Sequence, residues 1–358
     1  MHFPYSPTNF EAIIGAPTGR NPRGYVRGDN VSAVVYATLN QQIHELALTD
    51  GGWVHNSLSA YGGQGGTEPM GYRRSDNMSS VVYRGIDGHI HELALVGEEA
   101  FPWRDFDLTA HSGAPVGGSH PMGYVRHDNV SSVVYTGTDG HIHELALNAN
   151  DGGGWRDFDL TKESGAIVGG STPMGYVRHD SVSSVVYTGT DGHIHELALN
   201  ANDGGGWRDF DLTKESGAIV GGSTPMGYVR HDNVSVVDYT GADGHIHELA
   251  LNMNDGGAWR DFDLTMISGA PAGGLGPIGC NKQNGSSSVI YSSPSHEIHE
   301  LLYNKFIAWG YTNLSKEFEL QGNFHGSTPM GYVRSDGRYA IVFEQAARIH
   351  EFLLVKPQ

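Results

Sequence analysis

The fold is decided by residues 122–173, MGYVRHDNVSSVVYTGTDGHIHELALNANDGGGWRDFDLTKESGAIVGGSTP, because the chain repeats this stretch. Residues 174–225 are identical to it, except that Ser181 stands in place of Asn129. The tetrad Ile-His-Glu-Leu, or Ile-His-Glu-Phe at the last position, also recurs along the whole chain. Its seven copies start at Ile43, Ile90, Ile142, Ile194, Ile246, Ile298 and Ile349. A period of about 50 residues indicates one repeat architecture rather than two or three unrelated domains.

Each repeat predicts four short strands. In the third repeat they are Met122–Arg126, Ser131–Gly137, His141–Asn148 and Trp155–Lys162. The second is rich in Val and Tyr, which favour strands, and Thr138-Asp139-Gly140 is a hairpin signal between the second strand and the third. No segment has the apolar spacing of an amphipathic helix. The pattern therefore predicts an all-β, seven-bladed β-propeller with four-stranded antiparallel blades.

The two ends of the chain predict how the ring closes. The last repeat begins at Met330 and supplies only three strands, whereas residues 1–22 precede the first repeat. We expect the N-terminal strand to join the last blade, which leaves no open edge, with Phe3 near the Trp position. The chain, 1–358, would then form a single domain. Its blades would be residues 23–69, 70–121, 122–173, 174–225, 226–277, 278–329 and 330–358 plus 1–22.

The charge and composition exclude several classes of function. Lys and Arg number 22 and Asp and Glu 40, so the formal charge is −18. Phosphate binding requires a basic face, so this charge argues against nucleic acid and disfavours an anionic membrane surface. No apolar run approaches the roughly 18 residues that span a bilayer, and the start lacks the regions of a signal peptide. We expect a soluble protein without membrane insertion, cytoplasmic or released by a non-classical route, and with no intrachain disulfide at its single cysteine, Cys280.

The His-Glu pair of the tetrad has three interpretations. His143 and Glu144 could satisfy buried polar groups between blades, Glu144 could contact a ligand, or His141 and His143 could bind a metal. The position of His141 is occupied by other residues in three repeats, namely Gln42, Glu297 and Arg348. Without a third ligand at a fixed spacing we expect no metal. The loop 148–152 lacks the carboxylates of a calcium loop, so we expect no calcium and no cofactor.

Two further repeated motifs have both a structural and a functional interpretation. The pair Arg126 and Asp128 of the Tyr-x-Arg-x-Asp motif could form an ion pair that fixes a turn, or could offer donors and acceptors to vicinal hydroxyls. The Trp of six repeats, such as Trp155, could pack between blades or form a platform for a sugar. In the sixth repeat Cys280, Lys282 and Asn284 replace the Tyr, Arg and Asp. If the motif binds a ligand, we expect a weak site in that blade.

Nothing in the sequence indicates catalysis. It contains no Gly-x-Ser-x-Gly elbow, His-Glu-x-x-His or Walker loop. A catalytic centre on a ring requires residues that break the symmetry, whereas here the polar residues repeat. Repeated weak sites fit multivalent binding, because linkage raises avidity by about 10²–10⁴. We therefore expect a binding protein and not an enzyme.

The motif Met-Gly-Tyr-Val-Arg-x-Asp followed by Ser-Val-Val-Tyr-x-Gly-x-Asp-Gly-His-Ile-His-Glu-Leu resembles the seven-bladed β-propeller lectins of Photorhabdus. The resemblance extends over every repeat. It implies a soluble, calcium-independent, multivalent lectin, without catalytic activity, that binds fucose and related or O-methylated sugars in pockets between adjacent blades. It also implies glycan partners and a tendency to form homo-oligomers.

The run Ile142-His-Glu144, Asn150-Asp151-Gly and Trp155 is similar to the six-bladed fungal fucose lectins, in which the Glu accepts from sugar hydroxyls and the Trp contacts the apolar face. This resemblance pairs each Glu with the Trp of its own repeat: Glu92 with Trp103, Glu144 with Trp155, Glu196 with Trp207, and Glu248 with Trp259. The fungal pattern has an Arg on the second strand, where this chain has Val and Tyr. Arg126 on the first strand would have to take its place.

Our leading hypothesis is thus a lectin for fucosylated, galactosylated or O-methylated glycans. A protein-interaction scaffold is the alternative, and a glycosidase or lyase is a third. The candidate ligand-binding residues are Arg74, Asp76, Glu92, Trp103, Arg126, Asp128, Glu144, Trp155, Arg178, Asp180, Glu196, Trp207, Arg230, Asp232, Glu248 and Trp259.

Overall fold

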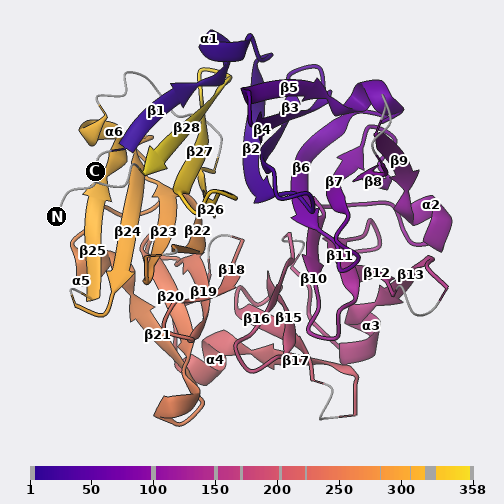
Figure 1. Ribbon diagram of the computed structural model, residues 1–358. Coiled ribbons are helices and arrows are strands. Elements are labelled where there is room, and N and C mark those ends of the chain that lie inside the picture. Colours follow the sequence, from indigo (N-terminus) through magenta and orange to yellow (C-terminus); the bar gives the residue numbers. More distant parts are fainter. Residues whose placement is uncertain are drawn as a thin grey trace.

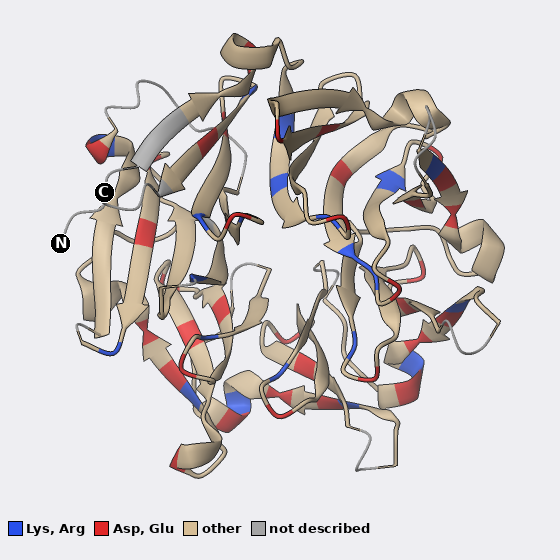
Figure 2. Cartoon of the chain, in the orientation of Figure 1, with Lys and Arg blue, Asp and Glu red and all other residues tan. Residues whose placement is uncertain are grey.

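The computed structural model describes residues 5–97, 102–148, 152–169, 172–200, 204–221, 224–282, 284–306, 308–318 and 328–354. Its strands form seven four-stranded antiparallel sheets, arranged around a central axis as the blades of a propeller (Figure 1). The predicted fold class is therefore confirmed. Figure 2 shows Asp and Glu distributed over the blades around the ring, so the negative charge is not gathered on one blade.

We number the blades in chain order. Blade 1 contains β2 (Gly19–Val26), β3 (Ser32–Thr38), β4 (Ile43–Thr49) and β5 (Gly52–Ser57), followed by the 3-10 turn η1 (Leu58–Tyr61). Blade 2 contains β6 (Gly66–Arg73), β7 (Ser79–Gly85), β8 (Ile90–Leu95) and β9 (Trp103–Asp107), then α2 (Leu108–Ser112). Blade 3 contains β10 (Met122–Val125), β11 (Ser131–Thr136), β12 (Ile142–Leu147) and β13 (Trp155–Asp159), then α3 (Leu160–Ser164).

Blades 4 to 6 follow the same plan. Blade 4 contains β14 (Met174–Val177), β15 (Ser183–Thr188), β16 (Ile194–Leu199) and β17 (Trp207–Asp211), then α4 (Leu212–Ser216). Blade 5 contains β18 (Met226–Val229), β19 (Ser235–Thr240), β20 (Ile246–Leu251), η4 (Met253–Asp255) and β21 (Trp259–Asp263), then α5 (Leu264–Ser268). Blade 6 contains β22 (Leu275–Lys282), β23 (Ser286–Ser292), β24 (Ile298–Asn304) and β25 (Ala308–Asn313), then α6 (Leu314–Glu317).

Blade 7 is built from both ends of the chain. It contains β26 (Met330–Val333), β27 (Tyr339–Gln345) and β28 (Arg348–Leu354), and its fourth strand is β1 (Tyr5–Asn9), which continues into α1 (Phe10–Ile14). β1 pairs antiparallel with β28, with Asn9 opposite His350, and the two strands lie side by side in Figure 1. The predicted closure of the ring is confirmed. Phe3 lies outside the described residues.

The short helix after the fourth strand was not expected. We predicted a strand from Trp155 to Lys162, but β13 ends at Asp159 and residues Leu160–Ser164 form one helical turn. The Asp159 side chain accepts a hydrogen bond from the Lys162 amide, and Gly165 ends the turn in the left-handed conformation with a φ of 74°. Five residues are too few to show an apolar period, so only the capping Asp and the Gly signal this helix.

Adjacent blades pack most closely at the inner strands. The Tyr72 ring of β6 lies against Gly123 of β10, so close that a Cβ on Gly123 would be 2.4 Å from the ring. Only glycine allows this approach. The same contact recurs between other neighbours, as Tyr332 on Gly24, Tyr25 on Gly71, Tyr124 on Gly175, Tyr176 on Gly227 and Tyr228 on Gly279. The Gly-Tyr dipeptide that starts each repeat therefore sets the distance between blades.

The inner strands surround an axial cavity of about 410 Å³. The residue before each Gly-Tyr points to it, so its lining includes a ring of Met70, Met122, Met174, Met226, Ile278 and Met330. Among the described residues, no helix is long and apolar enough to cross a membrane.

Candidate functional site

An arginine beside the first strand meets a buried glutamate of the third strand. In blade 3, Arg126 Nη1 lies 3.0 Å from Glu144 Oε2, and the same guanidinium bonds the carboxylate of Asp128. The pair recurs as Arg27–Glu45, Arg74–Glu92, Arg178–Glu196, Arg230–Glu248 and Arg334–Glu351. In blade 6 Lys282 takes the place of the arginine, with its Nζ 2.5 Å from Glu300 Oε1. The sixth repeat therefore keeps a cation at this position.

The glutamates are internal partners of these arginines. Glu144 is fully buried, and Ser132 donates a hydrogen bond to its Oε1. Burial raises the pKa of Glu144, and Arg126 opposes this shift by favouring the carboxylate. Burial would lower the pKa of Arg126, but Glu144 and Asp128 outweigh it and raise the pKa. The Glu thus fixes the guanidinium from behind, and Asp128 fixes it from the turn.

The tryptophan near each arginine comes from the next blade. The guanidinium carbon of Arg74 lies 5.9 Å from the centre of the Trp155 ring, and that of Arg178 lies 6.0 Å from Trp259. Arg27 faces Trp103 and Arg334 faces Trp53 in the same way. Trp207 of blade 4 packs against Tyr124 and Ile142 of blade 3. Burial of each Trp against the preceding blade is the packing role expected from sequence.

The pairing of Glu with the Trp of its own repeat does not bring those residues into one pocket. Opposite β12, Phe158 of β13 pairs with Glu144 and Trp155 pairs with Leu147. Side chains alternate between the two faces of a strand, so Glu144 and Phe158 share one face and Trp155 lies on the other. Glu144 therefore faces blade 4, whereas Trp155 faces blade 2. The physical cause is the two-residue period of the strand.

Two slots between blades combine these residues. The slot between blades 4 and 5, of about 250 Å³, is lined by Arg178, Glu196, Phe210, Glu215, Gly257 and Trp259. The slot between blades 2 and 3, of about 420 Å³, is lined by Arg74, Glu92, Phe106, His111, Gly153 and Trp155. Each therefore has an arginine and a buried glutamate at its base, aromatic rings from both blades, and a glycine beside the Trp. Such a slot can hold a small ligand with an apolar face and hydroxyl groups.

The phenylalanine of the outer strand was missed by the sequence analysis. Phe106, Phe158, Phe210 and Phe262 are 44%, 38%, 39% and 40% exposed, although they are large apolar residues. The signal was present in the repeated Trp-Arg-Asp-Phe-Asp segment, where alternation on an edge strand places the Phe opposite to the Trp. An aromatic side chain that is exposed at the same position of four blades marks a surface for contact.

The wall supplied by the short helix differs from slot to slot. His111 of α2 lines the slot between blades 2 and 3, and Glu215 of α4 lines the slot between blades 4 and 5. The same helix position is Glu163 in α3 and Ile267 in α5. Burial and the nearby Asp211 raise the pKa of Glu215, whereas Arg178 lowers it. The repeated slots therefore share a base and rings but differ in the polarity of one wall.

The slot between blades 5 and 6 differs in its aromatic ring. The Arg230 guanidinium carbon lies 4.1 Å from the centre of the Tyr303 ring, and Tyr303 in turn packs against Trp309. Arg230 also bonds Asp232 and lies 2.6 Å from Glu248, so the cation is held as in the other blades. Stacking of the guanidinium on a tyrosine covers a face of the ring that is open to a ligand elsewhere.

The histidine of the tetrad belongs to the other face of the blade. His143 is buried, with Nδ1 2.9 Å from Asp157 and Nε2 3.1 Å from Asp139, and its ring stacks on Tyr135. Burial alone would lower the pKa of His143, but Asp157 and Asp139 outweigh it and raise the pKa. Asp139 comes from the turn between β11 and β12, which is the rim opposite to Arg126. These contacts agree with the interpretation that the histidine satisfies buried polar groups.

No protein-family model matches the chain, and no curated protein sequence matches it either. Solved structures with a similar fold are lectins. BP39L lectin from Burkholderia pseudomallei aligns with a TM-score of 0.65 at 11% identity, over 92% of this chain and 97% of the lectin. AofleA from Arthrobotrys oligospora aligns with a TM-score of 0.56 at 13% identity, over 87% and 90%. Aleuria aurantia lectin, a six-bladed β-propeller, aligns with a TM-score of 0.51 at 13% identity, over 82% and 95%.

These similarities establish that the chain has the β-propeller fold found in lectins. The identity of 11–13% is too low to transfer residues from one protein to another. The number of blades also differs from the Aleuria protein, because the present chain has seven sheets. The site must therefore be argued from the slots of this chain.

Proposed function

We propose that the protein is a multivalent lectin whose slots between adjacent blades bind fucose-like or O-methylated sugars on glycans. The observation that carries the proposal is the slot itself, in which Arg178 and Trp259 meet an exposed Phe210. A deoxy or O-methyl sugar has an apolar patch and vicinal hydroxyls. The rings suit the patch, and the guanidinium donates to the hydroxyls.

The comparisons support this proposal at the level of the class of ligand. Aleuria aurantia lectin, with the same fold at a TM-score of 0.52, is known in complex with Fucalpha1-6GlcNAc. In the present chain we assign one slot to each pair of neighbouring blades. The proposed groups are Arg74, Asp76 and Glu92 with Trp155; Arg126, Asp128 and Glu144 with Trp207; Arg178, Asp180 and Glu196 with Trp259; and Arg230, Asp232 and Glu248 with Tyr303. Trp103 completes the slot that begins at Arg27.

A single slot of this size gives weak binding, and the ring compensates by repetition. Affinities of millimolar to tens of micromolar correspond to roughly −4 to −6.5 kcal/mol per slot. Slots on one rigid ring engage several sugars of a glycan surface at once, so avidity exceeds the affinity of one slot by about 10²–10⁴. We infer that the function is agglutination or adhesion of glycan-bearing surfaces, without turnover of the sugar.

The test uses the exposed phenylalanines, because their truncation removes a slot wall without unfolding a blade. We expect the variant F106A/F158A/F210A/F262A to lose haemagglutination and glycan-array binding, and to bind methyl α-L-fucoside at least tenfold more weakly by calorimetry. The control I13A/L39A/I86A removes side chains that are 61%, 58% and 62% exposed and are absent from the slot linings described above. This control should bind like the wild type.

Silence of the wild type on all fucosylated, galactosylated and methylated glycans refutes the proposal. Protein partners that remain bound in excess free sugar would replace it with the interaction scaffold. Turnover of an aryl glycoside would replace it with an enzyme.

A further inference from the structure

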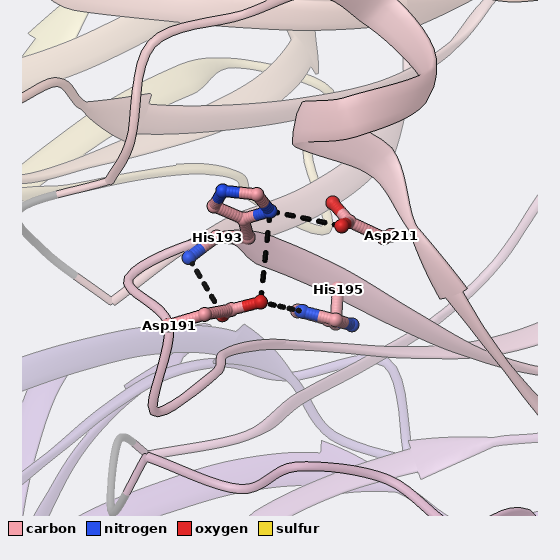
Figure 3. A group of neighbouring side chains, drawn as sticks. All are labelled: Asp191, His193, His195 and Asp211. Carbon is pink, nitrogen blue, oxygen red and sulfur yellow. Dashed lines mark hydrogen bonds and ion pairs between the residues drawn. The ribbon is translucent and has the colours of Figure 1, made fainter.

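Two histidines and two aspartates meet at the rim opposite to the sugar slots. In blade 4 the donors are Asp191 from the turn after β15, His193 and His195 at the start of β16, and Asp211 at the end of β17 (Figure 3). One ligand atom of each of the four residues lies within 4.8 Å of all the others. The sequence argument against a metal was the lack of a third donor at a fixed spacing. The fold supplies two, because the turn and the last strand end beside His193.

Each donor is held so that one atom faces the centre of the cluster. Asp191 Oδ1 accepts from the His193 amide at 3.0 Å, which leaves Oδ2 toward both imidazoles. Asp211 Oδ1 accepts from the Lys214 amide at 2.9 Å, which leaves Oδ2 toward His193. The buried ring of His195 has Nδ1 3.1 Å from Asp209, which orients its Nε2 toward Asp191.

Asp209 is in turn fixed by the Tyr187 hydroxyl, which donates to it at 2.6 Å. A carboxylate that orients the far nitrogen of an imidazole is the typical second shell of a metal-binding histidine.

The separations fit a tetrahedral ion. With metal–nitrogen and metal–oxygen bonds of about 2.0–2.1 Å, neighbouring ligand atoms of a zinc site lie about 3.3 Å apart. In blade 4, His193 Nδ1 lies 2.8 Å from Asp211 Oδ2 and 3.6 Å from Asp191 Oδ2, and His195 Nε2 lies 3.4 Å from Asp191 Oδ2. An ion can therefore enter with side-chain shifts of a few tenths of an ångström.

The cluster is present in four blades and lost as a unit in the others. Three of its donors lie together in blade 2 (Asp87, His89, Asp107), in blade 3 (Asp139, His141, His143) and in blade 5 (Asp243, His245, Asp263). In blade 1 the turn Asp, the first His and the last Asp become Asn40, Gln42 and Ser57. In blade 6 they become Ser295, Glu297 and Asn313. In blade 7 they become Ala346, Arg348 and Asn9.

Capping of the short helix does not explain the last Asp, because Asn9 and Asn313 cap α1 and α6 equally well. The second His remains in all seven blades, where it packs on the aromatic ring of the second strand. The residues that disappear together are therefore those that only a shared ligand requires together.

We propose that blades 2 to 5 each carry a binding site for a divalent transition metal of the zinc type, made by the turn Asp, both His and the last Asp. Two imidazoles and two carboxylates suit Zn²⁺ better than Ca²⁺ or Mg²⁺, which require more oxygen ligands. The ion would join the turn, the third strand and the helix start of one blade. These sites are separate from the sugar slots, which lie between blades at the opposite rim.

The test measures binding of the metal alone to the full, tag-free chain after treatment with a chelator. We expect up to four Zn²⁺ per chain by equilibrium dialysis and a rise in Tm on addition of ZnCl₂. CoCl₂ should give the intense visible bands of tetrahedral Co²⁺. The variant H89Q/H141Q/H193Q/H245Q should lose all three signals, and it should fold because Gln42 occupies this position in blade 1.

A matched control removes four other histidines, in H120Q/H127Q/H179Q/H231Q, and should retain wild-type stoichiometry and spectrum. A second variant, D87N/D139N/D191N/D243N, follows Asn40 of blade 1 and should also lose the metal. Equal Zn²⁺ uptake by the wild type and the H89Q/H141Q/H193Q/H245Q variant overturns the proposal, as does a Co²⁺ spectrum without tetrahedral bands. Sugar binding is measured on the same samples, so a failure of the lectin proposal is seen independently.

Discussion

Asp238 is the buried residue whose replacement by valine should stabilise the protein. It lies in β19 with 0% exposure, and neither of its carboxylate oxygens has a hydrogen-bond partner among the described residues. The equivalent position, opposite the first residue of the Met-Gly-Tyr motif, is apolar in every other blade. Those residues are Val35, Val82, Val134, Val186, Ile290 and Val342, all with 0% exposure.

The gain can be worked from this environment. The site already fits valine, and Asp and Val have similar volumes, so Asp238→Val introduces neither strain nor a cavity. It removes a carboxyl that is buried without compensation, at a cost of about 1–3 kcal/mol, and adds apolar burial. Replacing buried ionic groups by apolar ones of similar volume stabilises other proteins by about 1–4 kcal/mol. We therefore expect a free energy of unfolding about 2–4 kcal/mol higher at pH 7.

The gain should depend on pH in a defined direction. Burial and the nearby Glu248 carboxylate raise the pKa of Asp238 well above its ordinary value. Above the pKa of the unfolded chain, near 4, the unfolded state has released this proton while the folded state retains it. Stability of the wild type then falls as the pH rises toward the folded pKa. Asp238→Val abolishes this term, so its advantage should be larger at pH 7 than at pH 4.

Urea unfolding followed by tryptophan fluorescence at both pH values measures the difference, provided that the m-values agree. The reciprocal control is Val186→Asp, which places the same carboxyl in blade 4 and should destabilise the protein. A variant Asp238→Val that is less stable than the wild type, or whose gain is the same at pH 4 and pH 7, would refute the reasoning. In either case Asp238 would have a partner that the described contacts do not contain.

Three other predictions concern packing, closure and acid stability. Gly123→Ala should cost about 1–3 kcal/mol in urea unfolding, because its Cβ would lie 2.4 Å from the Tyr72 ring; Gly206→Ala, with no atom within 4 Å of the new Cβ, is the neutral control, and equal effects would contradict the packing argument. Deletion of residues 1–9 removes β1 and exposes the edge of β28, so light scattering should show aggregation, and a monodisperse, equally stable product would contradict this. Burial lowers the pKa of His299 to about 4, so the unfolded chain takes up a proton below pH 6.5 that the folded chain does not. The stability that the wild type loses at this residue between pH 7 and pH 5, about 2 kcal/mol, should be absent in His299→Gln, and an unchanged pH slope of the unfolding free energy would count against it.

The blades could be predicted because each local signal agrees with the repeat. In the third repeat, the expected strands Met122–Arg126, Ser131–Gly137 and His141–Asn148 differ by one residue at an end from β10, β11 and β12. The Asp-Gly turn and the Val-rich second strand determine these limits. The fourth strand was predicted too long, since Asp159 caps a helix that is too short to have a period.

The composition of the slots could not be predicted by pairing residues within one repeat. Glu144 and Trp155 are close in sequence, but they lie on opposite faces of blade 3 and so contribute to different slots. The partner of Glu196 is Trp259, one full repeat further along the chain. The alternation of Trp155 and Phe158 along the strand contained this information, and only the radial order of the blades converts it into a site.

The His-Asp cluster shows a similar limit. His193 and Asp211 are separated by a loop and a strand, and nothing in their spacing indicates that a helix cap will turn Asp211 Oδ2 toward the imidazole. The sequence identified the pair His193 and His195 as an i, i+2 motif on one strand face. The missing donors come from turn and cap geometry, which depends on backbone hydrogen bonds.

The pairing of β1 with β28 has a consequence for the synthesis of the protein. The first strand leaves the ribosome at once, but its partner, residues Arg348–Leu354, is made last. At 5–20 residues per second, β1 waits roughly 20–70 seconds while six blades are completed behind it. During this time the nascent ring is open at both ends and displays two unpaired strand edges. The cell must therefore keep the unfinished chains apart, and release of the last residues is the event that converts an adhesive intermediate into a closed, non-aggregating ring.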